Sequence, residues 1–146
     1  MTSKKLLLEI FKSNEERFFY RMSQSFPQLV EPFRGFQVES VMYEGKRFAI
    51  GETTYTPDFN LVLSRYVVVG DSTLKVSVLV NVEVKGSKKQ RGYELTRAKL
   101  SIAASSFPEY VWVEVMVDGR GFVFESFEII DKKPLVYVTR TVEKGV

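Results

Sequence analysis

The amino-acid sequence predicts a single α/β domain over residues 1–146, with helices packed against a mixed β-sheet, and three observations lead to this prediction. Residues 74–85 alternate almost without interruption between apolar and polar side chains, which indicates a β-strand. Residues 89–106 carry apolar side chains at helical spacing, and residues 110–117 are almost entirely apolar, as in a buried strand. A strand, a helix and a second strand in this order form a right-handed crossover whose two strands are parallel.

The composition excludes several classes of chemistry. The chain has 146 residues, 21 basic and 18 acidic side chains, and neither Cys nor His. Disulfides, thiolate metal sites, Cys nucleophiles, Ser-His-Asp triads and imidazole bases are therefore excluded, and any catalysis must use carboxylates, Lys, Tyr or water. No apolar segment suits a signal peptide or a membrane span, so we expect no membrane partner and a cytoplasmic location, the host cytoplasm if the chain is viral.

A helix is predicted to begin near Ser13. Ser13 and Glu16 have the spacing of a capping box, in which each side chain bonds the backbone of the other. Pro27 and Pro32 are expected to end this helical region, because the residue before a proline disfavours helical geometry. The apolar side of the helix comprises Phe18, Phe19 and Met22.

Two β-hairpins are predicted between residues 35 and 85. The first covers residues 35–50, with Glu44-Gly45 as its turn. The second joins a strand that runs from Pro57 through Val69 to the strand at 74–85, and Gly70-Asp71-Ser72 supplies its turn. We interpret Tyr55, just before the second hairpin, as a packing residue.

The helix predicted at residues 89–106 has two apolar sides. We expect the stronger one, formed by Leu95, Ala98, Ile102 and Ser106, to face the core, and the weaker one to comprise Tyr93, Leu100 and Ala104. Residues 122–130 and 135–141 are expected to add edge strands. The apolar residues at the first of these segments fit either a homodimer surface or the core: Phe122, Val123, Phe124, Phe127, Ile129 and Ile130.

Three charged residues form the most informative group in the sequence. Glu83 and Lys85 are two apart on one strand and therefore point to the same side of the sheet. The hairpin would bring Asp58 alongside them. Two carboxylates on neighbouring strands form a hard-oxygen site suited to Mg²⁺ or Mn²⁺, and such an ion activates water and offsets phosphate charge. The alternative for Asp58 is an ordinary aspartate at a turn or strand start. The alternative for Glu83 and Lys85 is an exposed strand face on which the two residues pair with each other.

The motif formed by Pro57-Asp58 and Glu83-Val84-Lys85 resembles that of the PD-(D/E)XK nuclease superfamily. The resemblance extends over roughly residues 13–117 and is closest to small phage, archaeal-virus and Holliday-junction-resolvase members. It implies a restriction-endonuclease-like three-layer core, with a central mixed β-sheet flanked by helices. It also implies a Mg-dependent deoxyribonuclease, an endonuclease that hydrolyses DNA by in-line attack of a metal-activated water, with a preference for branched structures.

The same resemblance implies residue roles. Asp58 and Glu83 would bind the metal together with the Val84 carbonyl, and Lys85 would position the water or stabilise the phosphate. Glu16 would complete a second metal position, although Glu15 competes for this role and the capping box explains Glu16 equally well. No nucleotide cofactor is expected. Two alternatives stay open: a non-catalytic nucleic-acid-binding module with the nuclease fold, and an interaction protein with incidental charges.

The charge distribution favours a DNA partner, with RNA not excluded. Residues 86–106 contain five basic residues and one acidic residue, which gives 5 − 1 = +4 against +3 for the whole chain. Basic side chains beside a carboxylate site attract a phosphate backbone. The alternative is a solvated helix face, on which Lys99 would be a surface side chain. The expected nucleic-acid-binding residues are Lys88, Lys89, Arg91, Arg97 and Lys99.

Overall fold

A computed structural model describes most of the chain, and for residue 29 and all residues after 120 it describes the backbone alone. The described ranges are 11–29, 33–86, 92–117, 121–130 and 133–143. Within them the helical elements are α2 (Asn14–Met22), the short 3₁₀ helix η1 (Ser23–Ser25), α3 (Phe26–Leu29) and α4 (Tyr93–Ser106). The strands are β1 (Gln37–Tyr43), β2 (Phe48–Ile50), β3 (Thr53–Tyr55), β4 (Phe59–Val69), β5 (Ser72–Lys85), β6 (Val111–Val117), β7 (Gly121–Ile130) and β8 (Lys133–Glu143).

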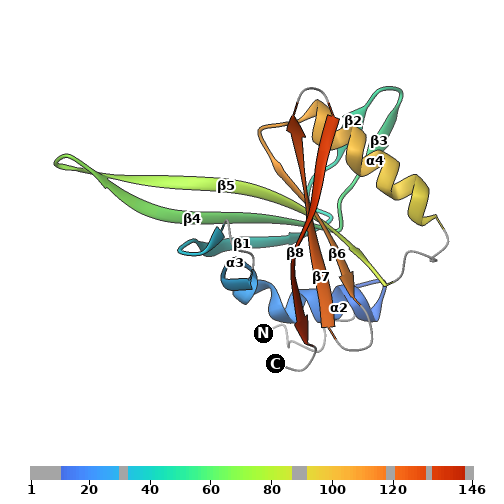
Figure 1. Ribbon diagram of the computed structural model, residues 1–146, viewed down its shortest axis with the longest axis horizontal. Coiled ribbons are helices and arrows are strands. Elements are labelled where there is room, and N and C mark those ends of the chain that lie inside the picture. The colour runs from blue at the N-terminus through green and yellow to red at the C-terminus, as the bar shows by residue number, and fades with distance from the viewer. Residues whose placement is uncertain (1–10, 30–32, 87–91, 118–120, 131–132, 144–146) are drawn as a thin grey trace.

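The main sheet is mixed, as the sequence predicts. Its strand order is β1-β4-β5-β6-β7-β8, and β2 and β3 form a separate small sheet. Strands β5 and β6 are parallel and connected through α4, whereas the other neighbouring pairs of the main sheet are antiparallel. The prediction of an α/β fold with a parallel crossover is therefore confirmed (Figure 1). The two strands expected after residue 120 are present as β7 and β8, but only β8 lies at the edge of the sheet, because β7 pairs with both β6 and β8. The side chains proposed for a dimer surface there lie outside the described residues.

Helix α2 begins where the sequence predicts. The Ser13 side chain accepts a hydrogen bond from the Glu16 backbone N–H at 3.1 Å, and Glu16 Oε1 accepts one from the Ser13 N–H at 3.2 Å. This capping box satisfies backbone groups that the first turn leaves unpaired. Pro27 does not end the helical region but lies inside the short helix α3, near its start, where a missing N–H is tolerated. The second expected end, at Pro32, lies outside the described residues.

The predicted hairpin at residues 35–50 is wrong. Strand β1 pairs with β4, and β2 pairs with β3 through a turn at Gly51, which has φ of 65°. The reason is burial: Phe48, Ile50 and Tyr55 pack around Trp112 and α4 on the far side of the sheet instead of extending β1. The chain therefore leaves β1 after Tyr43 and crosses to the other face.

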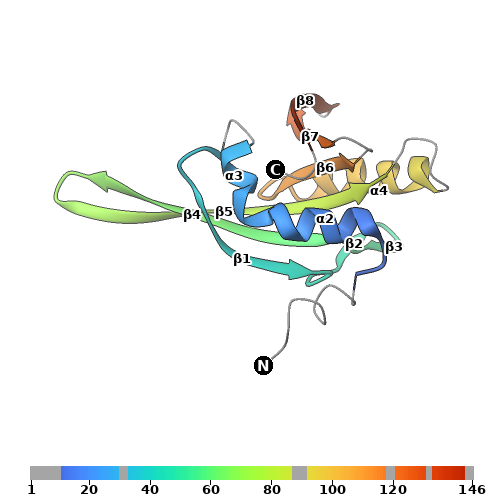
Figure 2. The same cartoon turned by 90° about the horizontal axis from the view of Figure 1, so that it is seen from below.

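The second predicted hairpin is confirmed. Strands β4 and β5 pair antiparallel from Phe59↔Val82 to Val69↔Ser72, and Gly70 takes the turn with φ of 59°. A positive φ is costly for residues with a side chain, which explains glycine at this point. Figures 1 and 2 show that the outer half of this hairpin projects well beyond the other elements.

Two apolar clusters cover opposite faces of the sheet. The first joins α2, through Phe19, to inward residues of β4, β5 and β6 such as Phe59 and Val82. The second surrounds Trp112 with residues of α4, β2 and β3. Alternate residues of a strand point to opposite faces, so Val113 and Trp112 belong to different clusters. Helix α2 consequently packs on one face of the sheet and α4 on the other.

The expected orientation of the second helix is wrong. Leu100, Ala103 and Ala104 are buried against the sheet, whereas Leu95 and Ile102 are 63% and 50% exposed. The small alanines let the helix backbone approach the bulky Trp112 closely, so compact residues rather than large ones mark the inner side. Among the described residues no helix has the length and apolar character needed to cross a membrane.

Replacement of Phe59 by alanine is expected to destabilise the protein by about 3–5 kcal/mol. Phe59 is fully buried, and its ring lies 5.0 Å from that of Phe19 and 5.4 Å from that of Tyr43, measured between centroids. The cavity would therefore open where α2 meets the sheet. Chemical denaturation measures the loss, and Leu95→Ala, at a 63% exposed position of α4, is the control. A loss below about 1 kcal/mol would contradict this account of the core.

Candidate active site

The structure brings Asp58, Glu83 and Lys85 together at one end of the β4–β5 hairpin. Glu83 and Lys85 lie at the carboxyl-terminal end of β5, on the face covered by α4. The Lys85 Nζ lies 3.4 Å from Glu83 Oε2. Asp58 immediately precedes β4, one residue outside the strand in which the sequence places it. Because Phe59 pairs with Val82, the next position brings Asp58 opposite Glu83.

Asp58 takes the place of a missing backbone partner. Strand β4 begins only at Phe59, so the Val84 N–H has no partner on that strand and donates instead to Asp58 Oδ2 at 2.8 Å. The N–H and C=O of one strand residue point to the same side. The Val84 carbonyl is thus directed toward the Asp58 side of β5, where a metal ligand is expected. The Asp58 backbone carbonyl is itself fixed by the Glu44 N–H at 2.8 Å.

Glu83 is held from two directions. The Tyr55 hydroxyl donates a hydrogen bond of 2.6 Å to Glu83 Oε1, and the Lys85 ammonium lies next to Oε2. Tyr55 and Glu83 are both buried, with exposed fractions of 6% and 5%. The sequence identifies Tyr55 only as a packing residue. It packs near Trp112, with ring centroids 6.3 Å apart, and in addition orients the carboxylate.

The two carboxyl groups influence each other's ionisation. Burial, followed by the charge of Glu83, raises the pKa of Asp58 well above its ordinary value, although the Val84 N–H acts in the opposite direction. Burial also raises the pKa of Glu83, against the lowering effects of Tyr55 and Lys85. Neighbouring carboxylates of this kind are stabilised by a bound proton or by a cation such as Mg²⁺, which prefers carboxylate oxygens.

A third buried carboxylate lies beside this pair. Glu114 of β6 is directly opposite Glu83 and is 1% exposed. Its Oε1 accepts hydrogen bonds from Arg97 at 3.0 Å and from the Tyr93 hydroxyl at 3.1 Å. Charged groups are therefore concentrated on this face of β5 and β6, where Lys85 lies next to Glu83 and Arg97 lies next to Glu114.

The two candidate carboxylates of α2 differ in their contacts. Glu16 Oε1 accepts hydrogen bonds from the backbone N–H groups of Lys12 and Ser13 and from the Tyr43 hydroxyl. Its charge contributes to the raised pKa of Asp58, but one oxygen serves the helix start. The carboxylate of Glu15 lies against Gly86, directly after Lys85: a Cβ added at Gly86 would come 2.7 Å from Glu15 Oε1. Any side chain at Gly86 would therefore displace Glu15.

The predicted basic residues have different positions. Lys88, Lys89 and Arg91 lie outside the described residues. Arg97 lies on the inner side of α4, where it binds Glu114 and also donates to the Tyr93 hydroxyl at 2.8 Å. Lys99 is half-buried on the same helix. The structure thus gives Arg97 a charge-balancing contact in addition to any contact with a phosphate.

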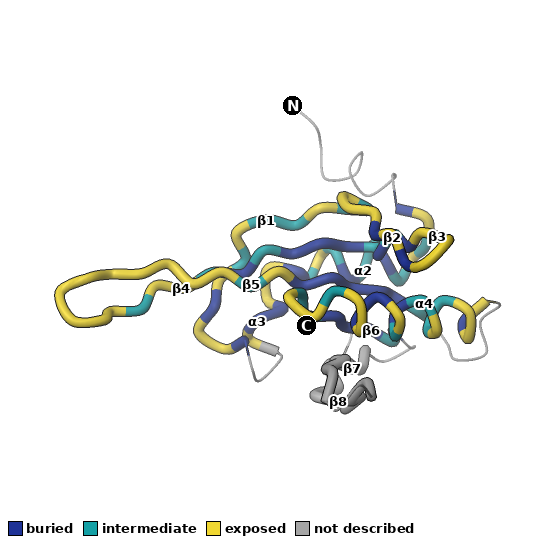
Figure 3. The backbone as a smooth tube through the Cα atoms, turned by 90° about the horizontal axis from the view of Figure 1, so that it is seen from above, coloured by how far each residue is buried: buried dark blue, intermediate teal, exposed yellow. Residues whose placement is uncertain are grey.

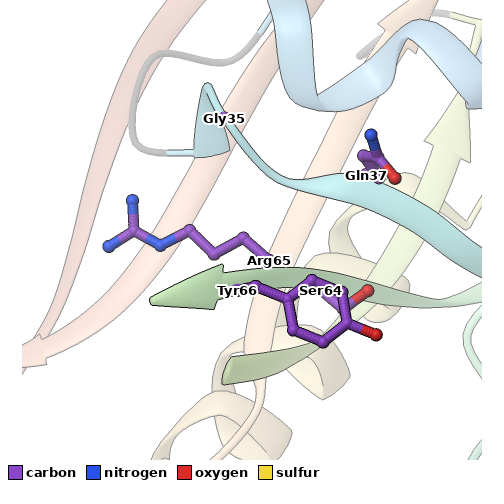
Figure 4. A pocket seen from close by; sticks show the side chains of 5 residues that line it. All are labelled: Gly35, Gln37, Ser64, Arg65 and Tyr66. Atoms are coloured by element: carbon purple, nitrogen blue, oxygen red, sulfur yellow. The ribbon is translucent and has the colours of Figure 1, made fainter. Parts of the chain in front are cut away.

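The site is a carboxylate pair rather than a closed metal cage. Within the described ranges, no three acidic side chains converge closely enough to enclose a metal. A hollow of about 310 Å³ lies elsewhere, between the start of β1 and β4 (Figure 4). Its lining residues are Gly35, Gln37, Ser64, Arg65 and Tyr66. The carboxylate pair therefore resembles an open two-ligand site whose remaining ligands come from backbone, water or substrate.

Glu114 was missed by the sequence interpretation, which treats residues 110–117 only as a buried strand. A signal was present, because Glu114 is the single charged residue in the run Val111–Val117. A charge in a buried central strand is costly unless it is paired or used. The position of Glu114 in the sequence therefore indicates a paired or functional carboxylate, as it does for Glu83.

Comparison of the chain with protein-family models, with curated proteins and with solved structures finds no match in any of the three. The functional interpretation therefore depends on the geometry and chemistry of the site.

Replacement of Tyr55 by phenylalanine is expected to weaken Mn²⁺ binding by about 10–100-fold, the usual effect of losing a partner that orients a metal ligand. The hydroxyl lowers the pKa of Glu83, so its loss raises that pKa and moves metal binding to higher pH. Calorimetric titration with Mn²⁺ across a pH series measures both effects. Tyr110→Phe removes a hydroxyl from the same aromatic cluster and is the control. Equal pH profiles for Tyr55→Phe and wild type would contradict the orienting role.

Proposed function

We propose that the protein is a metal-dependent nuclease of the PD-(D/E)XK type, which hydrolyses phosphodiester bonds in DNA. The observation that carries this proposal is the placement of Asp58 opposite the buried Glu83, with the Lys85 ammonium 3.4 Å from Glu83. Buried like charges are unfavourable, and they are typical of sites that bind a cation or move a proton. The finer fold assignment, a restriction-endonuclease-like three-layer core, is part of the proposal and is supported by helices on both faces of a mixed sheet.

The proposed reaction uses the metal and Lys85 in separate roles. Asp58, Glu83 and the Val84 carbonyl would hold Mg²⁺ or Mn²⁺. Such an ion would lower the pKa of a nearby water and offset charge on the phosphate. Lys85 orients that water or stabilises the additional charge at phosphorus. Water attacks phosphorus in line and loses a proton to solvent, while the P–O bond to the 3′ oxygen breaks and that oxygen takes up a proton, so the products carry a 5′-phosphate and a 3′-hydroxyl.

The proposed substrate is DNA, with branched DNA as the preferred form. Support comes from the excess of basic residues in the segment that follows Lys85. Because Arg97 balances Glu114, the phosphate contacts are assigned chiefly to Lys99 and to the basic residues at 88, 89 and 91. A phosphate backbone bound in this way brings the scissile bond to the end of β5.

Cleavage assays on single-stranded, duplex and four-way-branched DNA test the proposal. Wild-type protein is expected to cut in Mg²⁺ or Mn²⁺ and to be inactive in EDTA, and Lys85→Ala is expected to lose most of the activity. Lys46→Ala is the matched control, because Lys46 lies over the rings of Phe48 and Tyr110. DNA binding without cleavage in any metal would favour a non-catalytic binding module. If the protein neither binds nor cleaves any of these DNA substrates, the proposal is overturned.

A further inference from the structure

The outer half of the β4–β5 hairpin, residues 65–79, is an isolated two-stranded ribbon, which we name the β arm. Strand β1 pairs with β4 only as far as Ser64, and β6 pairs with β5 only from Val80 onward. Both edges of the β arm are therefore unpaired within the described part of the chain. At about 3.3 Å per residue, the arm extends roughly 20 Å beyond the sheet. Figure 3 shows it as almost continuously exposed.

Apolar side chains are concentrated on the β arm. Six of the nine large apolar side chains that are exposed in the described residues lie on it: Tyr66 (70%), Val68 (73%), Val69 (56%), Leu74 (50%), Val76 (38%) and Leu79 (40%). They occupy both faces, since Leu74 and Val76 continue the face of buried Val80, whereas Tyr66 and Val68 point the other way. Their combined exposed area is about 500 Å² and is divided between the two faces, so each face carries a smaller patch than the largest ones on monomeric proteins.

The charges on the β arm argue against a polyanionic partner. The arm carries two basic residues, Arg65 and Lys75, and the acidic Asp71 near its tip. The Arg65 guanidinium lies over the ring of Phe36, 5.0 Å from the centroid, and Lys75 forms a salt bridge with Glu39. Nucleic-acid binding requires several unpaired cations directed at phosphates. The arm instead offers apolar surface and open strand edges.

From these features we propose that the β arm joins two copies of this chain into a dimer, arm against arm across a two-fold axis. A second copy presents the same open edges and the same apolar faces, so the contact is self-complementary. Pairing of two open edges would satisfy backbone groups of both copies that have no strand partner, and apolar side chains beside those edges would contact their counterparts across the new pair of strands. A lone two-stranded ribbon is marginally stable in water, whereas two paired arms form a four-stranded sheet. The hollow at the base of the arm, shared by Tyr66, adjoins this surface (Figure 4).

This dimer is independent of the proposed nuclease activity, and its test measures mass alone. Size-exclusion chromatography with light scattering, over a series of protein concentrations, is expected to give twice the chain mass of 16.8 kDa for wild type. The double variant Tyr66→Lys/Val68→Lys is expected to give a single chain mass and at least a tenfold weaker dimer. Both positions are exposed, so circular dichroism should show an unchanged fold.

The matched control is Leu95→Lys/Ile102→Lys, which introduces the same charges at exposed apolar positions of α4. It should remain dimeric. A monomeric wild type at all concentrations would overturn the proposal, as would a dimeric arm variant or a control that dissociates equally. A monomeric wild type whose arm variant alone loses DNA binding would assign the arm to nucleic acid instead.

Discussion

Replacement of Glu83 by glutamine is expected to abolish metal-dependent cleavage while making the metal-free protein more stable. Glutamine keeps an oxygen that can accept the Tyr55 hydrogen bond, so the local packing is preserved. It removes the negative charge that raises the pKa of Asp58. Activity should fall by about a hundred- to a thousandfold, the scale on which loss of one electrostatic stabiliser acts. At a pH above the raised pKa of Asp58, the melting temperature in EDTA should rise, because the variant no longer holds two ionised carboxylates together.

The neighbouring carboxylate provides the control for this first prediction. Glu114→Gln changes the same functional group on the adjacent strand, opposite Glu83. Glu114 is bound by Arg97 and Tyr93, so its neutralisation is expected to destabilise the protein, by about 1–3 kcal/mol. Thermal unfolding of both variants in EDTA measures the difference. If both variants lose stability equally, Glu83 is a structural carboxylate and the interpretation of the pair as a cation site is wrong.

The second large effect is a dependence of stability on pH that Mg²⁺ reverses. The folded-state pKa of Asp58 is raised above its ordinary value of 3.8, so the folded protein binds this proton more tightly than the unfolded chain. Stability is therefore greatest below pH 3.8 with respect to this group, and it falls as the pH rises through the raised pKa. Unfolding measured in EDTA across this window should show the decrease, and Asp58→Asn should remove it.

Mg²⁺ should restore the stability that is lost on deprotonation. At about one hundred times its dissociation constant, a ligand that binds only the folded state stabilises it by about 2.7 kcal/mol. The gain should be large above the raised pKa of Asp58 and small below it, since the ion competes with the proton that Asp58 binds. Calorimetry in two buffers of different ionisation enthalpy should show proton release on binding. An equal gain at every pH, or a gain retained by Asp58→Asn, would place the cation elsewhere.

The sequence predicts the parts of the fold that depend on strong periodicity. The β4–β5 hairpin, the β5–α4–β6 crossover and the capped start of α2 are all present. The partners of β1 and β2 could not be predicted, because short strands pair according to which face buries their side chains. The inner side of α4 was assigned to Leu95 and Ile102, whereas close approach to Trp112 favours Leu100 and the small alanines.

For the site, the sequence predicts which groups meet but not how they are held. Alternation on β5 puts Glu83 and Lys85 on one side, and antiparallel pairing brings in Asp58. The hydroxyl of Tyr55 and the charge of Glu114 come from elements whose placement depends on tertiary packing. The role of Arg97 also depends on tertiary packing, because only the position of α4 on the sheet shows that Arg97 faces Glu114.

Anomalous scattering from crystals soaked in Mn²⁺ tests the central claim most directly. A peak is expected within about 2.2 Å of three atoms: a carboxylate oxygen of Asp58, a carboxylate oxygen of Glu83 and the carbonyl oxygen of Val84. The peak should be absent in Glu83→Gln crystals. A protein that is saturated with Mn²⁺ in solution but shows no peak between these residues would contradict the assignment of this pair as the metal site.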